Sequence, residues 1–327
     1  MTNEGALQSA AEALDRVRNE IAKVFIGQRQ LVDQTLISLL AGGHLLVEGV
    51  PGLGKTLLVR ALAKAIGGES RRVQFTPDLM PSDITGNIML DVQSGTFITR
   101  KGPVFTNVLI ADEINRSPAK TQAALFEAMQ EFQVSLDGNE YPLPRPFMVL
   151  ATQNPFEHEG TYPLPDAQKD RFLMKLLIDY PGAEEEKEMV RRVLEGSTGA
   201  ELSLEGVGQA LSSDEFIALR DLASQIHLAP ELIDYAVRLV SATRSQEAGS
   251  SALETGAGPR GSLALIRCAR GRALLEGRDF VIPDDIKALA VPVLIHRIRV
   301  SAESDLEGLS EVQAVEALVS KVEAPRT

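Results

Sequence analysis

The octapeptide GVPGLGKT, residues 49–56, restricts the possible folds more than any other segment of the chain. It fits the phosphate-loop pattern G-x-x-x-x-G-K-[ST], in which glycines let backbone N–H groups surround phosphates at a helix N-terminus. The apolar run HLLVE precedes it, and the helical pattern KTLLVRALAKAIGG follows it. A strand, a glycine-rich loop and a helix in this order predict a nucleotide-binding α/β fold. A dinucleotide-binding fold is excluded, because its loop has the spacing G-x-G-x-x-G.

The positions of this loop have separate predicted roles. Lys55 is expected to bridge the terminal phosphates of a nucleoside triphosphate such as ATP, and Thr56 is expected to ligate Mg²⁺. The other predicted nucleotide contacts come from the loop and the start of its helix, at Gly49, Val50, Pro51, Gly52, Leu53, Gly54 and Leu57. The structural alternative is a glycine-rich turn that carries a surface lysine.

Two acids end the apolar run VLIADE, residues 108–113. A buried strand tolerates paired carboxylates at its tip only if a cation compensates them, and a phosphate-bound Mg²⁺ would do so. Asp112 is therefore predicted to support the metal, and Glu113 to act as the base that polarises an attacking water. Without the phosphate loop, the same pattern would fit a strand end with a solvated acid equally well. Ser117 and Pro118 are then predicted as the N-cap and the first turn of the next helix.

A third buried strand, FMVLATQN, ends in an amide. Asn154 can both donate and accept, so it could hold the attacking water between Glu113 and the γ-phosphate. The alternative is a turn residue, because a proline follows it. Further along, Arg171 in YPLPDAQKDRFLMKL either pairs with a neighbouring acid such as Asp170 or presents its charge to a phosphate.

The pattern of the chain changes at Pro181-Gly182. Up to about residue 180, short apolar runs alternate with amphipathic helical patterns, which indicates βαβ units and a mostly parallel sheet. Five helical patterns follow. We therefore predict a nucleotide-binding α/β domain at residues 1–180 and an all-helical domain at residues 181–327. NIMLDVQSGTFIT and VSLDGNEYPL are predicted as inserted β-hairpins, which either contact a partner or are surface decoration.

Composition narrows the remaining classes of protein. The 33 basic and 45 acidic residues give a net charge of −12, which argues against a surface built to track nucleic-acid phosphates. A single cysteine, Cys268, cannot form an internal disulfide, and the four histidines form no zinc-site spacing with it, so any metal would have oxygen ligands. No apolar run approaches the length of a membrane span. We expect a soluble cytoplasmic protein with no membrane partner.

These motifs together resemble the AAA+ ATPases and, within them, the MoxR family. The resemblance runs from FIGQ, residues 25–28, to GRDFVIPDDI, residues 277–286, and is most specific in LLVEGVPGLGKT and ADEINRSPAKTQAALFEAMQE. It implies an AAA+ core followed by a helical lid. The roles it implies are Walker A for residues 49–56, Walker B for Asp112 and Glu113, sensor 1 for Asn154, arginine finger for Arg171, sensor 2 for Arg260 in GPRG, and an adenine pocket lined by Phe25, Ile26, Gly27 and Gln28.

The resemblance also implies a function. It implies Mg-dependent ATP hydrolysis in a homo-oligomeric ring, usually a hexamer, with Arg171 reaching the nucleotide of the neighbouring subunit and both hairpins facing the pore. The implied role is chaperone-like remodelling or activation of proteins, with von Willebrand factor A domain proteins as partners. Two alternatives stay open: a nucleotide-dependent assembly scaffold, and a nucleic-acid or magnesium-chelatase-type motor subunit. Arg116 contacts either a neighbouring subunit or a local acid.

Overall fold

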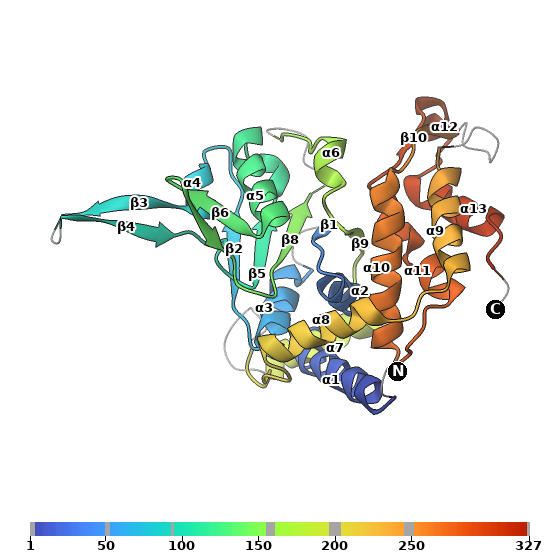
Figure 1. The fold of residues 1–327 in the computed structure, drawn as a ribbon, viewed down its shortest axis with the longest axis horizontal. Coiled ribbons are helices and arrows are strands. Elements are labelled where there is room, and N and C mark those ends of the chain that lie inside the picture. Colours follow the sequence, from blue (N-terminus) through green and yellow to red (C-terminus); the bar gives the residue numbers. More distant parts are fainter. Residues whose placement is uncertain are drawn as a thin grey trace.

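A five-stranded parallel sheet lies at the centre of the chain in the computed structural model, which describes residues 4–49, 53–92, 95–154, 161–195, 204–244 and 252–325 (Figure 1). The spatial order is β2 (Ser70–Gln74), β5 (Val108–Asp112), β8 (Met148–Gln153), β1 (Leu45–Gly49) and β9 (Met174–Ile178). Every neighbouring pair is parallel. The mostly parallel sheet is therefore confirmed, with β1, β5 and β8 at the three predicted apolar runs.

Successive residues on the central strands belong to two different hydrophobic cores. On β1, Leu45 and Val47 face the larger core, whereas Leu46 faces the smaller one. β5 and β8 alternate in the same way, with Val108, Ile110, Met148 and Leu150 in the larger core and Leu109, Ala111, Val149 and Ala151 in the smaller. The period is two because successive strand side chains point to opposite faces. The continuous apolar runs in the sequence reflect a sheet that is buried on both faces.

Helices close both cores. The larger core includes residues of α1 (Glu4–Ala22), α2 (Arg29–Leu40) and α3 (Lys55–Ala65). The smaller core includes residues of α4 (Pro81–Thr85) and α5 (Ala119–Glu131). The short helix α6 (Asp166–Lys169) precedes β9. Helices on both faces of a parallel sheet give the predicted three-layer arrangement.

The start of α5 differs from its prediction. Ser117 is not the N-cap: Pro118 occupies that position in extended conformation, and its carbonyl accepts the N–H groups of Thr121 and Gln122. The reason is a 3-10 turn, η1 (Ile114–Arg116), which follows β5 and places Ser117 one residue too early, with its hydroxyl buried. The turn is held by the Gln122 side chain, which donates to the carbonyls of Ile114 and Ser117 at 3.2 and 3.0 Å.

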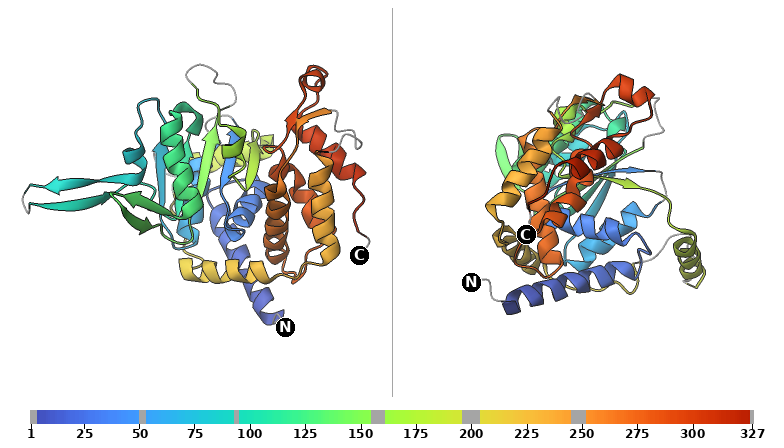
Figure 2. Two further views of the ribbon diagram at one scale, coloured as in Figure 1. Left: turned by 45° about the horizontal axis from the view of Figure 1, so that its top comes forward. Right: turned by 90° about the vertical axis from the view of Figure 1, so that its right-hand side faces the viewer.

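Both predicted hairpins are present. β3 (Gly86–Asp91) pairs with β4 (Thr96–Lys101), and β6 (Gln133–Leu136) pairs with β7 (Asn139–Pro142), each antiparallel. Asp137 and Gly138 both have positive φ, 49° and 79°, as a two-residue hairpin turn of type I′ requires. The β3–β4 hairpin projects far from the rest of the molecule (Figures 1 and 2).

The chain after residue 182 forms the predicted helical lid, with one addition. Its helices are α7 (Ala183–Glu195), α8 (Ser213–Gln225), α9 (Pro230–Ala242), α10 (Pro259–Leu275), α11 (Pro283–Leu294), α12 (Ala302–Leu306) and α13 (Glu311–Lys321). The addition is a two-stranded antiparallel sheet of β10 (Leu253–Thr255) and β11 (Arg299–Val300). None of the helices described is both long and apolar enough to cross a membrane.

The lid packs on the N-terminal helices, and most of its described buried apolar residues belong to the larger core. α10 lies against α1 and α2, and α8 also lies against α2. The larger core accordingly runs without interruption from Leu14 and Leu36 to Leu265 and Ile286. Pro181-Gly182 thus separates two sequence patterns that share one hydrophobic core.

His44, just before β1, is a buried histidine with both ring nitrogens engaged. Its Nδ1 accepts the N–H of Val149 at 3.0 Å, so its Nε2 carries the hydrogen donated to the Met129 carbonyl, also at 3.0 Å. The ring packs against Phe132 and Phe147, with centroids 5.9 and 5.8 Å away. Burial lowers the pKa of His44 to about 4. The neutral ring therefore joins the ends of α5, β1 and β8.

This pKa predicts an acid-dependent loss of stability. The folded pKa lies below the ordinary value of 6.5, so the unfolded chain binds the proton more tightly. The contribution of His44 is therefore complete above pH 6.5 and is lost as the pH falls towards 4. Between about pH 7 and pH 5 the wild type should lose roughly 2 kcal/mol of unfolding free energy more than His44→Gln in urea titrations. The exposed His227 gives a matched control as His227→Gln, and equal losses in wild type and His44→Gln would contradict the prediction.

Candidate functional site

The predicted phosphate loop and the predicted polar strand ends lie at one edge of the sheet. Glu48 of β1 is opposite Gln153 of β8, and Gln74 of β2 is opposite Asp112 of β5. The carboxyl ends of these parallel strands therefore bring together Gly49, Asp112 and Asn154, which directly follows β8. Ligands of open α/β sheets bind at this edge. Three predicted loop residues, Val50, Pro51 and Gly52, lie outside the described residues.

Lys55 starts the helix that follows the loop. Gly54 caps α3 with a φ of 76°, and Lys55 and Thr56 occupy its first two positions. The Lys55 ammonium donates to the Gly49 carbonyl at 2.9 Å and so lies across the loop. Burial lowers the pKa of Lys55, although Asp112 and Glu113 act in the opposite direction. This ammonium is a cation at the mouth of a loop, where a phosphate could replace the carbonyl as its acceptor.

The FIGQ segment lies between the loop and α7. The buried ring of Phe25 approaches Gly54 so closely that a Cβ there would be 3.2 Å from it. Gly27 has a φ of 70°, and the Glu185 carboxyl from α7 fills the space that a side chain at Gly27 would need. Ile26, between Phe25 and Gly27 in the sequence, is half-buried. The Gln28 amide donates to the Asp179 carbonyl at 3.4 Å. The segment predicted to contact adenine is thus adjacent to the phosphate loop.

Asp112 and Glu113 are fixed by a threonine that the sequence analysis missed. The buried Thr152 hydroxyl donates to Asp112 Oδ1 at 2.5 Å and accepts the backbone N–H of Glu113 at 2.9 Å. Glu113 has a φ of 55°, in the left-handed region that few residues other than glycine adopt. One hydroxyl therefore sets the position of both acids.

Two strand residues of β2, which were also missed, contact the acids. Arg72 donates to Asp112 Oδ2 through Nη2 at 2.5 Å and through Nε at 3.1 Å. Gln74 donates to Glu113 Oε2 at 2.9 Å, and Arg116 makes an ion pair with the same oxygen at 3.1 Å. Arg116 therefore contacts a local acid, which is one of the two alternatives predicted for this residue. The paired carboxylates are compensated by cations of the same chain.

The site fits Mg²⁺ only when the metal also has ligands from a nucleotide. In the described part of the chain, no three His, Cys, Asp or Glu side chains gather as a metal-binding group. Mg²⁺ in nucleotide sites typically binds one or two protein oxygens together with substrate phosphates and waters. Thr56 and Asp112, at the same edge of the sheet, are the residues that would supply these protein oxygens.

Arg171 lies at the opposite edge of the sheet. It precedes β9, whose first residue Met174 is opposite Leu45, whereas Ile178 at the other end is opposite Gly49. A strand of this length separates its two ends by roughly 16 Å. The Arg171 guanidinium lies 5.6 Å from the centre of the Phe126 ring. The arginine therefore cannot lie beside the phosphate loop of its own chain.

The acid next to Arg171 has other partners. Asp170 pairs with Arg297 at 2.9 Å and with Arg260, from the first turn of α10, at 3.6 Å. Among the described residues no ion pair joins Asp170 to Arg171, so the proposed local pair is wrong: two lid arginines occupy the carboxylate instead. Arg260 consequently lies near Arg171, at the end of the sheet opposite to Gly49.

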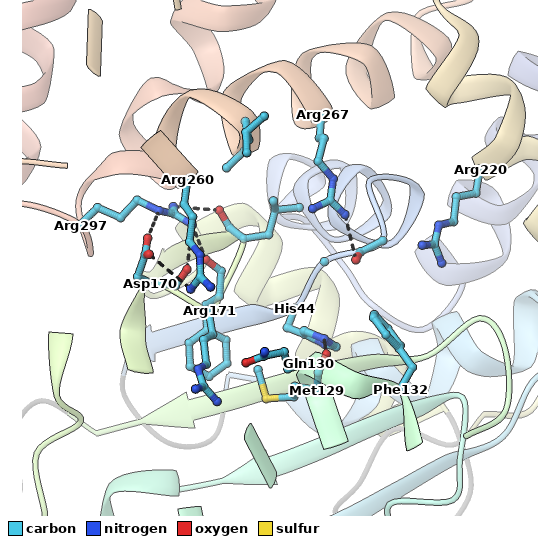
Figure 3. A pocket seen from close by; sticks show the side chains of 16 residues that line it. His44, Met129, Gln130, Phe132, Asp170, Arg171, Arg220, Arg260, Arg267 and Arg297 are labelled. Carbon is cyan, nitrogen blue, oxygen red and sulfur yellow. Dashed lines mark hydrogen bonds and ion pairs between the residues drawn. The ribbon is translucent and has the colours of Figure 1, made fainter. Parts of the chain in front are cut away.

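An arginine-rich cavity surrounds this second cluster (Figure 3). Its volume is about 350 Å³, and it lies between α5, α8, α10 and the segments that lead into β1 and β9. Its charged lining residues are Asp170, Arg171, Arg220, Arg260, Arg267 and Arg297. Burial and the nearby Arg267 lower the pKa of Arg220. Among the described lining residues, five arginines surround one acid, and this excess of positive charge suits an anionic group.

Comparison with known proteins places both halves of the chain in the same family. Residues 44–174 match the model of the ATPase family associated with various cellular activities (AAA), and residues 230–318 match that of the AAA lid domain. Chaperone MoxR1 of Mycobacterium tuberculosis is 44% identical over 98% of this chain and 85% of its own length. Protein MoxR of Paracoccus denitrificans is 35% identical over 85% and 86%. A crystal structure from Cytophaga hutchinsonii, described as a "putative ATPase", superposes with a TM-score of 0.91 at 41% identity and covers 99% of this chain and 98% of its own.

Removing the Thr152 hydroxyl should impair turnover more than binding. Thr152→Val keeps the branched shape but leaves the Glu113 N–H without its acceptor and removes the hydroxyl that donates to Asp112 Oδ1. We expect kcat for ATP hydrolysis to fall about 10-fold, the equivalent of about 1.4 kcal/mol. Steady-state kinetics would measure kcat, and a separate titration would measure the affinity for the nucleotide. Thr152→Ser keeps the hydroxyl and serves as the control, and a valine variant as fast as the serine variant would contradict the assignment.

Proposed function

Because the chain belongs to the MoxR family of AAA+ ATPases, we propose that it hydrolyses Mg-ATP in a homo-oligomeric ring, as a cytoplasmic hexamer, and that this turnover remodels or activates a separate protein. The observation that carries the proposal is the separation of two sets of residues. The phosphate loop and the paired acids lie at the carboxyl ends of the strands, whereas Arg171 and Arg260 lie at the amino ends. The nucleotide site of one subunit is therefore complete only when its phosphate loop meets Arg171 and Arg260 of a neighbouring subunit.

Each residue at the first edge has a defined task in this proposal. Lys55 and the N-terminus of α3 bind the terminal phosphates, and Thr56 with Asp112 would hold Mg²⁺. The metal, when bound, supplies positive charge to the phosphate oxygens. Glu113 accepts a proton from the attacking water, and Asn154 orients that water. Thr152 keeps the two acids in register for these tasks.

The neighbouring subunit supplies the remaining charge. Arg171 and Arg260 would enter the phosphate site of the next subunit and stabilise the charge that develops on the γ-phosphate. An arginine finger contributes roughly 10³- to 10⁵-fold to related phosphoryl transfers. The cation cluster around the cavity supports this role, because Asp170 alone cannot neutralise it.

The protein partner is inferred from the family. One relative is named a chaperone, and the family resemblance points to proteins with von Willebrand factor A domains. The β3–β4 hairpin exposes five large apolar side chains, Met89, Leu90, Val92, Phe97 and Ile98, on an arm that projects from the body (Figure 1). Such an arm suits contact with another protein.

Mixed rings should test the shared site. Arg171→Ala and Lys55→Ala subunits should each be inactive alone, because each lacks one half of every site. Mixed, they should regain turnover wherever an intact Lys55 site meets an intact Arg171. Size-exclusion chromatography with two differently tagged chains verifies that they assemble together. Verified mixed rings without any recovery would overturn the assignment between subunits.

Glu113→Gln should bind ATP without turning it over, because the amide cannot accept a proton. Steady-state hydrolysis and equilibrium ATP binding measure the two properties. Unchanged hydrolysis would remove Glu113 from the role of base. The same variant, held in its ATP state, should retain a purified von Willebrand factor A domain protein better in ATP than in ADP. Wild-type protein that binds ATP but never hydrolyses it would favour the scaffold alternative, and stimulation by DNA or RNA the motor.

A further inference from the structure

Arg297 is a buried arginine that directly contacts the segment carrying Arg171. It lies just after α11 in the lid, and only 3% of its side chain is exposed. Its Nε donates to Asp170 Oδ1 at 2.9 Å. Its Nη2 donates to the Phe172 carbonyl at 2.6 Å, and its Nη1 to the Leu173 carbonyl at 3.2 Å and to the Val293 carbonyl of α11. One guanidinium thus binds the chain on both sides of Arg171.

Further hydrogen bonds hold the backbone of Arg171, whereas its side chain is exposed. The N–H groups of Arg171 and Phe172 bond to the carbonyls of Gln168 and Lys169 at 3.1 and 3.0 Å. His296 adds a second lid contact, since its Nε2 lies 3.0 Å from the Phe172 carbonyl. The Arg171 guanidinium itself rests on the Phe126 ring and points away from Arg297 and Asp170 (Figure 3).

The chemistry of this cluster requires an arginine. A buried guanidinium is costly unless its N–H groups find acceptors, and here a planar fork reaches one carboxylate and several carbonyls at once. A lysine ammonium is a single point and cannot reach acceptors that lie in these separate directions. The cluster also requires an acid at Asp170, because its second oxygen, Oδ2, forms an ion pair with Arg260 at 3.6 Å. Two lid elements, α10 and the end of α11, therefore meet on the carboxylate next to Arg171.

We propose that Arg297 and Asp170 are a positioning pair that fixes the arginine finger Arg171 to the lid, so that the lid of one subunit sets the phosphate contact in its neighbour. This inference rests on the proposed function, because it assigns a role within the shared site. It also predicts a direction: loss of the pair damages the finger that a subunit donates and spares the phosphate loop of that same subunit.

The lid offers a control pair of the same charge, in which the aspartate rather than the arginine is the buried member. Arg278 binds Asp285 through two bonds of 2.8 and 2.6 Å, and Asp285 is 1% exposed. This pair resembles the Arg297–Asp170 pair in chemistry, but in the described part of the chain the contacts of Arg278 stay within the lid. Arg278→Lys therefore reports the effect of weakening a buried lid pair that has no contact with residues 170–173.

The experiment compares Arg297→Lys with Arg278→Lys in the full chain. For Arg297→Lys alone we expect kcat to fall about 100-fold with little change in the affinity for ATP, because a finger displaced by about 1 Å costs this much. Mixed with Lys55→Ala, which has an intact finger, Arg297→Lys should recover as Arg171→Ala does. Mixed with Arg171→Ala, it should not recover, because neither subunit then donates a working finger. Arg278→Lys should turn over ATP near the wild-type rate even where its melting temperature falls.

Opposite outcomes overturn the proposal. Recovery of Arg297→Lys with both partners, recovery with neither in verified mixed rings, or an equal loss of kcat in Arg278→Lys would each assign Arg297 a merely structural role. If Arg297→Lys does not fold, Asp170→Asn removes the charge with little change of shape and should give the same directional pattern. Failure of the reference mixture of Lys55→Ala and Arg171→Ala would instead overturn the shared site itself. The kcat of Arg297→Lys against Arg278→Lys would then decide the positioning role alone.

Discussion

The parallel pairing of β1 with both β8 and β9 is the constraint on which the rest of the molecule depends. It sends the carboxyl ends of the strands to one edge, with Gly49, Asp112 and Asn154, and the amino ends to the other, with His44 and Arg171. If β9 ran antiparallel to β1, the residues before it would lie beside the phosphate loop. The direction of a single edge strand therefore decides whether the arginine and the loop can belong to one subunit.

The acids of the site pair with arginines that are themselves accessible to solvent. Arg72 is half exposed where it meets Asp112, and Arg116 is likewise accessible where it meets Glu113. Exposed ion pairs of this kind contribute only about 0–1 kcal/mol. Such pairs compensate the carboxylates and can be exchanged at small cost for a stronger cation. Thr152 is buried, so its hydrogen bonds to the two acids are not exposed to solvent in the same way.

Local patterns in the sequence predict most of the architecture and the centre of the site. The phosphate loop, β5, β8 and both hairpins each carry their own signal, in a motif, an apolar run or an Asp-Gly turn. β2 carries none, because only Val73 of its five residues is buried, and with it Arg72 and Gln74 were missed. Thr152 could have been found, since it lies two residues before Asn154 at the same strand end. Arg297 could not, because its acid is 127 residues away in the chain. Ser117 was misassigned since a 3-10 turn moved the start of the helix by one residue.

The shared core has a consequence for how the chain is made. α2 and α10 approach closely enough that a Cβ on Gly271 would lie 3.3 Å from the Ile37 carbonyl, and Arg267 of α10 donates to the carbonyl of Ala41, 226 residues earlier. At about 5–20 residues per second, the ribosome needs roughly 11 to 45 s to add that much chain. Throughout this interval the apolar faces of α1 and α2 lack the helix that covers them. The newly made N-terminal half is therefore itself a protein with exposed hydrophobic surface, and its native burial is finished only when the lid emerges.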